Sequence, residues 1–250
     1  MTTLFQKRIL IFGATSAIAQ EVARSLAAHS CRFVLVARNR QRLQSVASDL
    51  ISRGASSADV MVTDLAELAG HDELVESAWS ALGAADIAVL AHGLLGDQAA
   101  AQSDFQAARN ILETNFISAA SLITLLVNKF EHQGFGSLVV LGSVAGDRGR
   151  KSNYVYGSSK AALDCFLAGI RHRLHGSGIQ VLTVKPGLVD TPMTAHLPKS
   201  RLFARSEVVG RKIVSAIQKG KRTAYVPSYW RPVMMLIRHL PEPIFNRLEI

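Results

Sequence analysis

The chain has 250 residues, of which 48% are hydrophobic and 19% charged, a composition that argues for one globular α/β domain and against disorder. Its net charge of +9 suits a soluble basic surface, a nucleic acid, an anionic membrane or a phosphorylated ligand. No stretch reaches the roughly 18 uninterrupted apolar residues of a membrane span, and Cys31 and Cys165 lack metal-ligand spacing, so we expect a reducing, cytoplasmic compartment and no metal site.

Short apolar runs bounded by Gly, Asp, Asn or Pro predict strands at 9–12, 33–37, 60–62, 87–91, 138–141 and 181–184, with a seventh around 223–226. These runs are apolar on both faces, as in a parallel sheet covered on both sides. The segments between them are long enough for crossover helices, at 18–28, 72–82, 115–130 and 158–174. The pattern predicts a single doubly wound, Rossmann-type α/β domain over residues 1–228, with an apolar and basic C-terminal extension over 229–250.

The first strand runs into the turn Gly13-Ala14-Thr15-Ser16-Ala17-Ile18-Ala19. A helix that starts there presents free N–H groups and a positive dipole end to a pyrophosphate. Gly13 permits the tight turn, whereas Ala17 and Ala19 replace the later glycines of the usual motif. We expect cofactor contacts from the residues of this turn, although a plain strand-to-helix turn is the alternative: Gly13, Thr15, Ser16, Ala17 and Ile18.

Arg38 follows the second strand. An acidic residue there would bind a ribose 2′-hydroxyl, whereas an arginine favours a 2′-phosphate, so Arg38 predicts NADP(H) in preference to NAD(H), with Arg40 or Arg42 assisting. A solvated charge at a helix start is the alternative. Asp64, after the third strand, either caps the next helix or binds the adenine amino group.

Tyr156 and Lys160 are spaced four residues apart, so at a helix start they share one face. An ammonium beside a phenol favours the phenolate and lowers its pKa, which suits proton exchange with a carbonyl oxygen. Ser143 ends the fifth strand, where it could hold the substrate oxygen. Asn115 lies inside a helical pattern and binds either backbone or a water that relays protons to Lys160. Tyr154 has no base four residues after it.

These residues, in this order, resemble the short-chain dehydrogenase/reductase family over nearly the whole chain. The resemblance implies reversible hydride transfer between a nicotinamide and a carbonyl or alcohol. It implies that Asn115, Ser143, Tyr156 and Lys160 are catalytic, with Lys160 also holding the nicotinamide ribose. It also implies cofactor contacts at Ala91-His92-Gly93, where the family usually has Asn-Ala-Gly, and after the sixth strand at Pro186, Gly187, Val189 and Thr191.

Segments 13–16, 93–97, 143–148 and 233–241 are similar to those of the decaprenylphosphoryl-2-keto-erythropentose reductases. This closer likeness implies reduction of a lipid-linked keto-sugar that a flavin-dependent oxidase partner supplies. His92 departs from the wider family and alters the local hydrogen bonding. Reduction of 3-oxoacyl or small ketone substrates, and non-catalytic NADP(H) sensing, stay open as alternatives.

The C-terminal tail interleaves apolar residues with Arg231, Arg238, His239 and Arg247, while Pro241 and Pro243 prevent one long helix. An amphipathic helix of this kind contacts an anionic membrane surface on the cytoplasmic side, or it packs on the core, the substrate cleft or a partner subunit. No pattern for nucleic-acid recognition stands out. The family resemblance implies a homo-oligomer.

Overall fold

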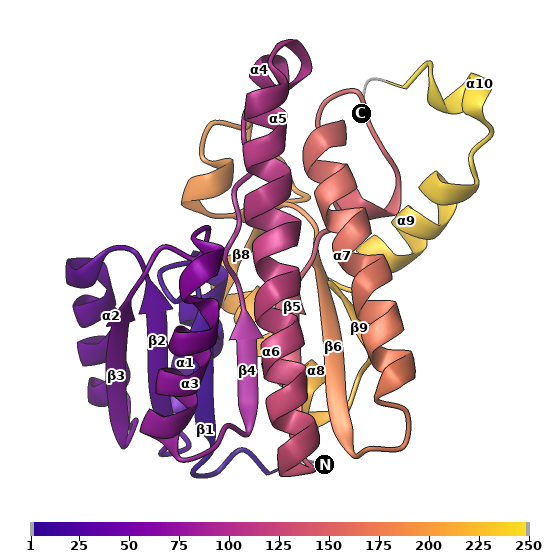
Figure 1. Cartoon of the computed structure of the whole chain (residues 1–250). Coiled ribbons are helices and arrows are strands. Elements are labelled where there is room, and N and C mark those ends of the chain that lie inside the picture. Colours follow the sequence, from indigo (N-terminus) through magenta and orange to yellow (C-terminus); the bar gives the residue numbers. More distant parts are fainter. Residues whose placement is uncertain (1–2, 249–250) are drawn as a thin grey trace.

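A computed structural model describes residues 3–248 and shows a seven-stranded sheet with helices on both faces (Figure 1). Neighbouring strands are parallel throughout, in the order β3-β2-β1-β4-β5-β6-β9. The predicted doubly wound fold is therefore confirmed, including its seventh strand. The strands are β1 (Arg8–Phe12), β2 (Arg32–Ala37), β3 (Ser57–Val62), β4 (Ile87–Leu90), β5 (Gly136–Leu141), β6 (Ile179–Pro186) and β9 (Thr223–Val226).

The strands are apolar on both sides because alternate residues enter two separate cores. In β1, Ile9 and Ile11 enter the first core, whereas Leu10 and Phe12 enter the second. The helices that cover the first core are α1 (Ala17–Ala27), α2 (Arg40–Ser52) and α8 (Ser206–Gln218). The helices that cover the second are α3 (His71–Leu82), α6 (Ser118–Gln133) and α7 (Tyr154–Arg173).

Two of these helices, α2 and α8, are absent from the sequence-based prediction. In α2 only Leu43, Val46 and Leu50 are buried, and the rest of the helix is mostly polar. So few buried positions give a weak helical period, and the packing against α1 and β3 supplies what the pattern lacks. The remaining short elements are η1 (Leu68–Gly70), α4 (Gln98–Ser103), η3 (Val144–Asp147), η4 (Pro192–Thr194) and a small parallel pair, β7 (Val189–Asp190) and β8 (Ala204–Arg205).

The longest helical run joins α5 (Phe105–Leu112), a π-helical turn η2 (Glu113–Ile117) and α6 end to end (Figure 1). Within residues 3–248 it is the one helix long and apolar enough, by length and composition, to cross a membrane. Its apolar face nevertheless packs inside the protein: Leu122, Leu126 and Phe130 are fully buried in the second core. In this fold the run is a core helix, and its π-helical turn re-aims the side chains that follow.

The C-terminal extension forms α9 (Trp230–His239), which lies beside α7, and α10 (Glu242–Phe245), which stands out from the body of the domain (Figure 1). The chain turns out of the helix between them, as the prolines predict. Trp230 and Met234 are buried against Val144 of η3, so the inner face of α9 packs on the core. The outer face leaves Met235 and Leu236 exposed. Contact of this face with a membrane, a homo-oligomer and a flavin-dependent partner stay predictions.

The close packing of α1 on α8 depends on Gly210, where an added Cβ would lie 2.7 Å from the backbone carbon of Glu21. We expect Gly210→Ala to lower the free energy of unfolding by about 1–3 kcal/mol, because the helices must separate. Gly169, inside α7, is the matched control, since a Cβ there has no heavy atom within 4 Å. Gly169→Ala should instead raise stability by about 0.5–1 kcal/mol. Urea unfolding of both variants measures the difference, and equal stabilisation would contradict this account.

Candidate active site

A cleft of about 1210 Å³ lies at the carboxyl ends of the strands. The strand order reverses there between β1 and β4, which is where open α/β sheets bind ligands. Among the site residues predicted from sequence, Asn115 and the possible helper Arg40 do not line it. The predicted residues that do are Gly13, Thr15, Ser16, Ala17, Ile18, Arg38, Asp64, Ala91, His92, Gly93, Ser143, Tyr156, Lys160, Pro186, Gly187, Val189 and Thr191.

The turn after β1 packs directly on the backbone that follows β4. Gly13 has a φ of +78°, and a Cβ there would lie 2.5 Å from the His92 nitrogen, so only glycine fits. Ser16 is the N-cap of α1 and its side chain makes no capping hydrogen bond, which leaves the hydroxyl and the first N–H groups of the helix to a ligand. The methyl of Ala19 is buried in the first core and not in the cleft. Having alanine at position 19 therefore leaves the ligand side of the turn open.

Two guanidinium groups line the cleft beyond β2. Arg38 is exposed, and its Nη1 lies 3.5 Å from Asp64 Oδ2. Arg42 also lines the cleft, whereas Arg40 does not. Asp64 Oδ1 accepts a hydrogen bond from the Ala66 N–H at 3.0 Å, so the carboxylate caps the turn after β3. An exposed ion pair this long is weak, and both arginines stay available to an anion.

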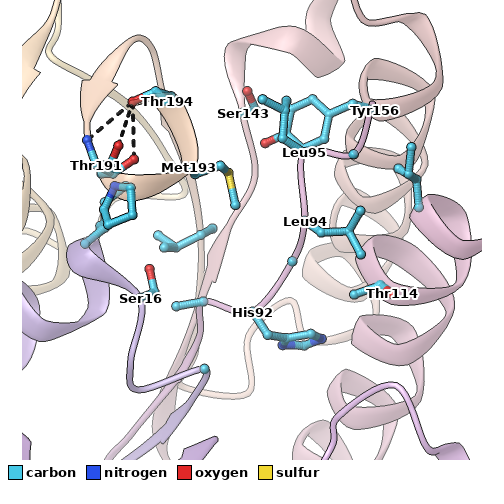
Figure 2. Close-up of a pocket in the computed structure, with 18 of the residues that line it drawn as sticks. Ser16, His92, Leu94, Leu95, Thr114, Ser143, Tyr156, Thr191, Met193 and Thr194 are labelled. Carbon is cyan, nitrogen blue, oxygen red and sulfur yellow. Dashed lines mark hydrogen bonds between the residues drawn. The ribbon is translucent and has the colours of Figure 1, made fainter. Parts of the chain in front are cut away.

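The loop after β6 closes another side of the cleft. Thr194 Oγ1 donates to the Val189 carbonyl at 2.6 Å and also accepts from the Thr191 N–H at 3.3 Å, which fixes the turn that presents Met193 (Figure 2). Gly187 lies against the indole of Trp230, and a Cβ on Gly187 would overlap the ring. The cleft loop and α9 are thus in direct contact.

Tyr156 and Ser143 meet at the other end of the cleft, across from Ser16 and Met193 (Figure 2). The two side chains lie close together in the cleft. Ser143 Oγ accepts the Ala145 N–H at 3.1 Å, which fixes its position. Burial raises the pKa of Tyr156, and the nearby Ser143 side chain opposes that shift. The phenol is therefore held in its protonated form near neutral pH.

Lys160 lies beneath Tyr156, with Nζ 5.7 Å from the centre of the phenol ring. Its Nζ donates to the Leu141 carbonyl at 3.1 Å, and burial lowers its pKa to about 8 against the opposing charge of Asp164. The expectation that Lys160 lowers the pKa of Tyr156 is not met in this geometry. The ammonium is directed at the end of β5 and not at the hydroxyl, so burial decides the direction of the shift.

Asn115 acts on the backbone, which is one of the two roles left open from the sequence. Its Oδ1 accepts the Leu94 N–H at 2.8 Å, and its Nδ2 donates to the Leu94 carbonyl at 2.8 Å and to Ser159 Oγ at 3.1 Å. The amide thereby ties the segment after β4 to α7. Gly93 packs so closely that a Cβ would lie 2.9 Å from Asn115 Oδ1. Asn115 is buried behind the cleft and is a positioning residue.

His92 is held in a buried polar chain that the sequence does not reveal. Its Nε2 lies 3.1 Å from Ser118 Oγ, and Ser118 donates to the Leu65 carbonyl. Ser118 therefore accepts from an Nε2–H of His92, which leaves Nδ1 unprotonated. Burial lowers the pKa of His92 to about 3, with Lys160 adding to the shift. The imidazole is neutral, and its buried Nδ1 has no hydrogen-bond partner among the described residues.

Four polar residues that complete the cleft near Tyr156 are absent from the sequence-based prediction: Gln98, Arg150, Ser152 and Asn153. A signal was available, because the loop between Ser143 and Tyr156 must lie at the same edge of the sheet as those two residues. No short-range pattern shows which of its side chains turn inward.

A phosphate-binding turn at the switch point and a Tyr–Ser–Lys group across the same cleft define a nucleotide-dependent oxidoreductase. The chain belongs to the short-chain dehydrogenase family, whose sequence model, described as short chain dehydrogenase, matches residues 7–202. It is an oxidoreductase of that family, which binds a nicotinamide cofactor.

Similar proteins agree with this family. An uncharacterized oxidoreductase of Mycobacterium tuberculosis is 40% identical over 240 residues, which is 96% of each chain. One from Streptomyces coelicolor is 36% identical over 98% of this chain and 96% of its own. A short-chain type dehydrogenase/reductase from Mycobacterium ulcerans superposes with a TM-score of 0.79 at 20% identity, covering 90% of this chain and 89% of that one. A variant of an actinorhodin polyketide ketoreductase, solved with NADPH, gives 0.79 at 23% identity, covering 90% and 97%.

The lowered pKa of Lys160 predicts a pH dependence of stability. Between its folded value of about 8 and its usual 10.5, the folded protein binds fewer protons than the unfolded chain, so the free energy of unfolding rises with pH. We expect wild type to gain stability over Lys160→Met progressively from pH 8 to pH 10.5, as measured by urea unfolding. Lys212→Met, which removes an exposed amine instead of a buried one, is the control. If the difference in free energy of unfolding between wild type and Lys160→Met stays constant across this pH range, the lowered pKa of Lys160 is contradicted.

Proposed function

We propose that this chain is an NADP(H)-dependent reductase of a keto group on a polar substrate, a keto-sugar. The observation that carries the proposal is the contact of Tyr156 with Ser143 inside the cleft, above a buried Lys160. A phenol that burial keeps protonated can donate its proton to the substrate carbonyl oxygen as that oxygen becomes negative during reduction.

The choice of NADP(H) draws its support from the end of the cleft beyond β2. Arg38 and Arg42 line that end, and a 2′-phosphate there would meet two guanidinium groups. The diphosphate would be held by the N–H groups at the start of α1 and by Ser16. The fold-related polyketide ketoreductase, solved with NADPH, is consistent with this choice.

When bound, the nicotinamide supplies a hydride to the carbonyl carbon. The chain's own residues serve the oxygen. Ser143 donates a hydrogen bond that orients the carbonyl, and the Tyr156 hydroxyl gives its proton to the oxygen as the C=O becomes an alcohol. Lys160, buried beneath the phenol with its Nζ directed at the Leu141 carbonyl, would hold the nicotinamide ribose. Asn115 keeps the segment after β4 and α7 in register, so that these groups stay aligned.

A polar substrate is favoured by the residues around Tyr156. Gln98, Arg150 and Asn153 bring amide and guanidinium groups into the cleft, which suits hydroxyl-bearing carbons beside the ketone. Attachment of the sugar to a lipid is a further step of the same proposal. It draws on the exposed apolar face of α9, whose inner face contacts the cleft loop at Gly187.

Removal of the Tyr156 hydroxyl tests the proton donor. We expect Tyr156→Phe to lower kcat for ketose reduction by about 10²–10⁴-fold, because the developing alkoxide loses its acid. Affinity for NADPH, followed by its fluorescence on titration, should survive. Tyr154→Phe is the control, since Tyr154 lies on the same helix with 42% of its surface exposed. Full activity of Tyr156→Phe in NADPH oxidation by a ketose panel would refute the assignment.

Arg38→Ala tests the choice of cofactor. We expect the ratio of kcat/KM with NADPH to that with NADH to fall about 10- to 100-fold, since a charged hydrogen bond to the 2′-phosphate is lost. Arg40→Ala removes the same charge two residues away, from a side chain outside the cleft, and should leave the ratio unchanged. An unchanged ratio in Arg38→Ala would mean that this arginine does not select the cofactor.

A further inference from the structure

The turn that follows β3, residues 64–66 and named the β3 turn, forms the wall of the cleft next to Arg38. The Ala66 N–H donates to Asp64 Oδ1 at 3.0 Å. That bond stays inside the turn, so it shapes the backbone but does not attach it to the rest of the domain. The attachment comes from the Leu65 carbonyl, whose hydrogen bonds are buried.

The Leu65 carbonyl oxygen receives two donors from two different helices. Ser118, the first residue of α6, donates through its hydroxyl, and His71, the first residue of α3, donates through Nε2 at 3.1 Å. Both side chains are fully buried. The Ser121 hydroxyl lies 2.9 Å from His71 Nδ1 and holds that ring. A carbonyl oxygen has two lone pairs, so this one is fully used, and the β3 turn is tied to α3 and α6.

The Ser118 hydroxyl does not follow the usual pattern of a helix. A serine or threonine hydroxyl in a helix can donate to the carbonyl one turn earlier, as Thr124 does to Ala120 at 2.8 Å. Ser118 instead accepts from His92 Nε2 at 3.1 Å and donates to Leu65. The donation from His92 occupies one lone pair of the Ser118 oxygen and leaves the hydroxyl proton to the carbonyl. His92 thereby sets the direction of the hydroxyl.

His92 lies between the two ends of the cleft. It comes from the segment after β4, and its imidazole points away from Ser16 (Figure 2). The charges of Lys160 at the chemical end and of Asp64 in the β3 turn both reach it. Because burial keeps the ring neutral, with a pKa of about 3, its hydrogen-bonding pattern does not change with pH around neutrality.

We propose that His92 is a positioning residue for the adenosine half of the cofactor. Through Ser118 it fixes the Leu65 carbonyl, and the fixed carbonyl holds the β3 turn, with Asp64, as the wall against which the adenosine lies. A wall that is ordered before binding spares the ligand the entropy cost of ordering it. This role rests on the proposed binding of NADP(H) with its 2′-phosphate at Arg38, and the imidazole itself touches no ligand.

Binding of adenosine 2′,5′-bisphosphate tests this role, because that nucleotide carries the adenosine half of NADP(H) and no nicotinamide. We expect its Kd, measured by calorimetry, to rise about 3- to 10-fold in His92→Ala and in Ser118→Ala, which is the effect of one lost hydrogen bond. Thr124→Ala removes an exposed hydroxyl of the same helix and should bind like wild type. Wild-type affinity in His92→Ala overturns the proposal.

The double variant tests the route of the effect. If His92 acts only through Ser118, removal of both side chains weakens binding no more than removal of the Ser118 hydroxyl alone. The Kd of His92→Ala/Ser118→Ala should therefore equal that of Ser118→Ala. Losses that multiply in the double variant mean that His92 acts by another route, and they overturn the proposal.

A conservative variant separates positioning from loss of fold. The amide nitrogen of a glutamine can donate as the histidine Nε2 does, so His92→Gln should recover most of the affinity. The same calorimetry gives the number of sites per chain, which falls with any unfolded fraction while the Kd of the folded remainder is unchanged. Fewer sites in His92→Ala without a higher Kd mean a role in folding alone and overturn the proposal. A folded His92→Gln that binds as weakly as His92→Ala contradicts it too.

The whole cofactor shows which half depends on His92. We expect the Kd of NADPH, followed by its fluorescence on titration, to rise in His92→Ala by the same factor as the Kd of adenosine 2′,5′-bisphosphate. A rise for NADPH alone would place the effect at the nicotinamide half and overturn the proposal.

Adenosine 5′-diphosphate, which lacks the 2′-phosphate, tests the choice of cofactor separately. If wild type binds it more tightly than the 2′,5′-bisphosphate, the preference for NADP(H) fails. A Kd for adenosine 5′-diphosphate that rises in His92→Ala then still supports the positioning role. If wild type binds NADPH but neither adenosine nucleotide, the positioning role is overturned, because the β3 turn contributes no affinity.

Discussion

The close approach of Gly13 to the backbone after β4 is the constraint on which the rest of the site depends. It brings the turn before α1 against Ala91 and His92, so that the helix N-terminus faces the place where the strand order reverses. The segment after β4 is in turn held by Asn115, which also binds Ser159 of α7. One series of contacts therefore fixes the phosphate end and the chemical end of the cleft relative to each other.

Much of this arrangement is contained in local sequence. Strands buried on both sides are apolar throughout, so their number and parallel order could be predicted from runs such as 33–37. The catalytic group could be placed because Ser143 closely follows a strand and Tyr156 lies in the first turn of a helix, and both positions lie at one edge of a doubly wound sheet. α2 was missed because it buries few side chains, whereas α8 was missed although Val209, Ile213 and Ile217 recur at helical spacing.

Other properties depend on contacts between distant segments. The pKa of Tyr156 rises because of burial, while Lys160 turns to the Leu141 carbonyl; a four-residue spacing does not contain that direction. The charge of Asp147, on the same loop as Arg150, is paired with Lys185 of β6. Neither fact could be predicted from the segment of sequence that carries the residue concerned.

The contact of Gly187 with Trp230 links two positions that are far apart in the chain. The indole fills the space that any side chain at 187 would need, so glycine is required there only while a large ring stands at 230. A relative with a small residue at 230 is free to carry alanine or serine in its cofactor loop. Substitutions at these two positions should therefore covary among related sequences.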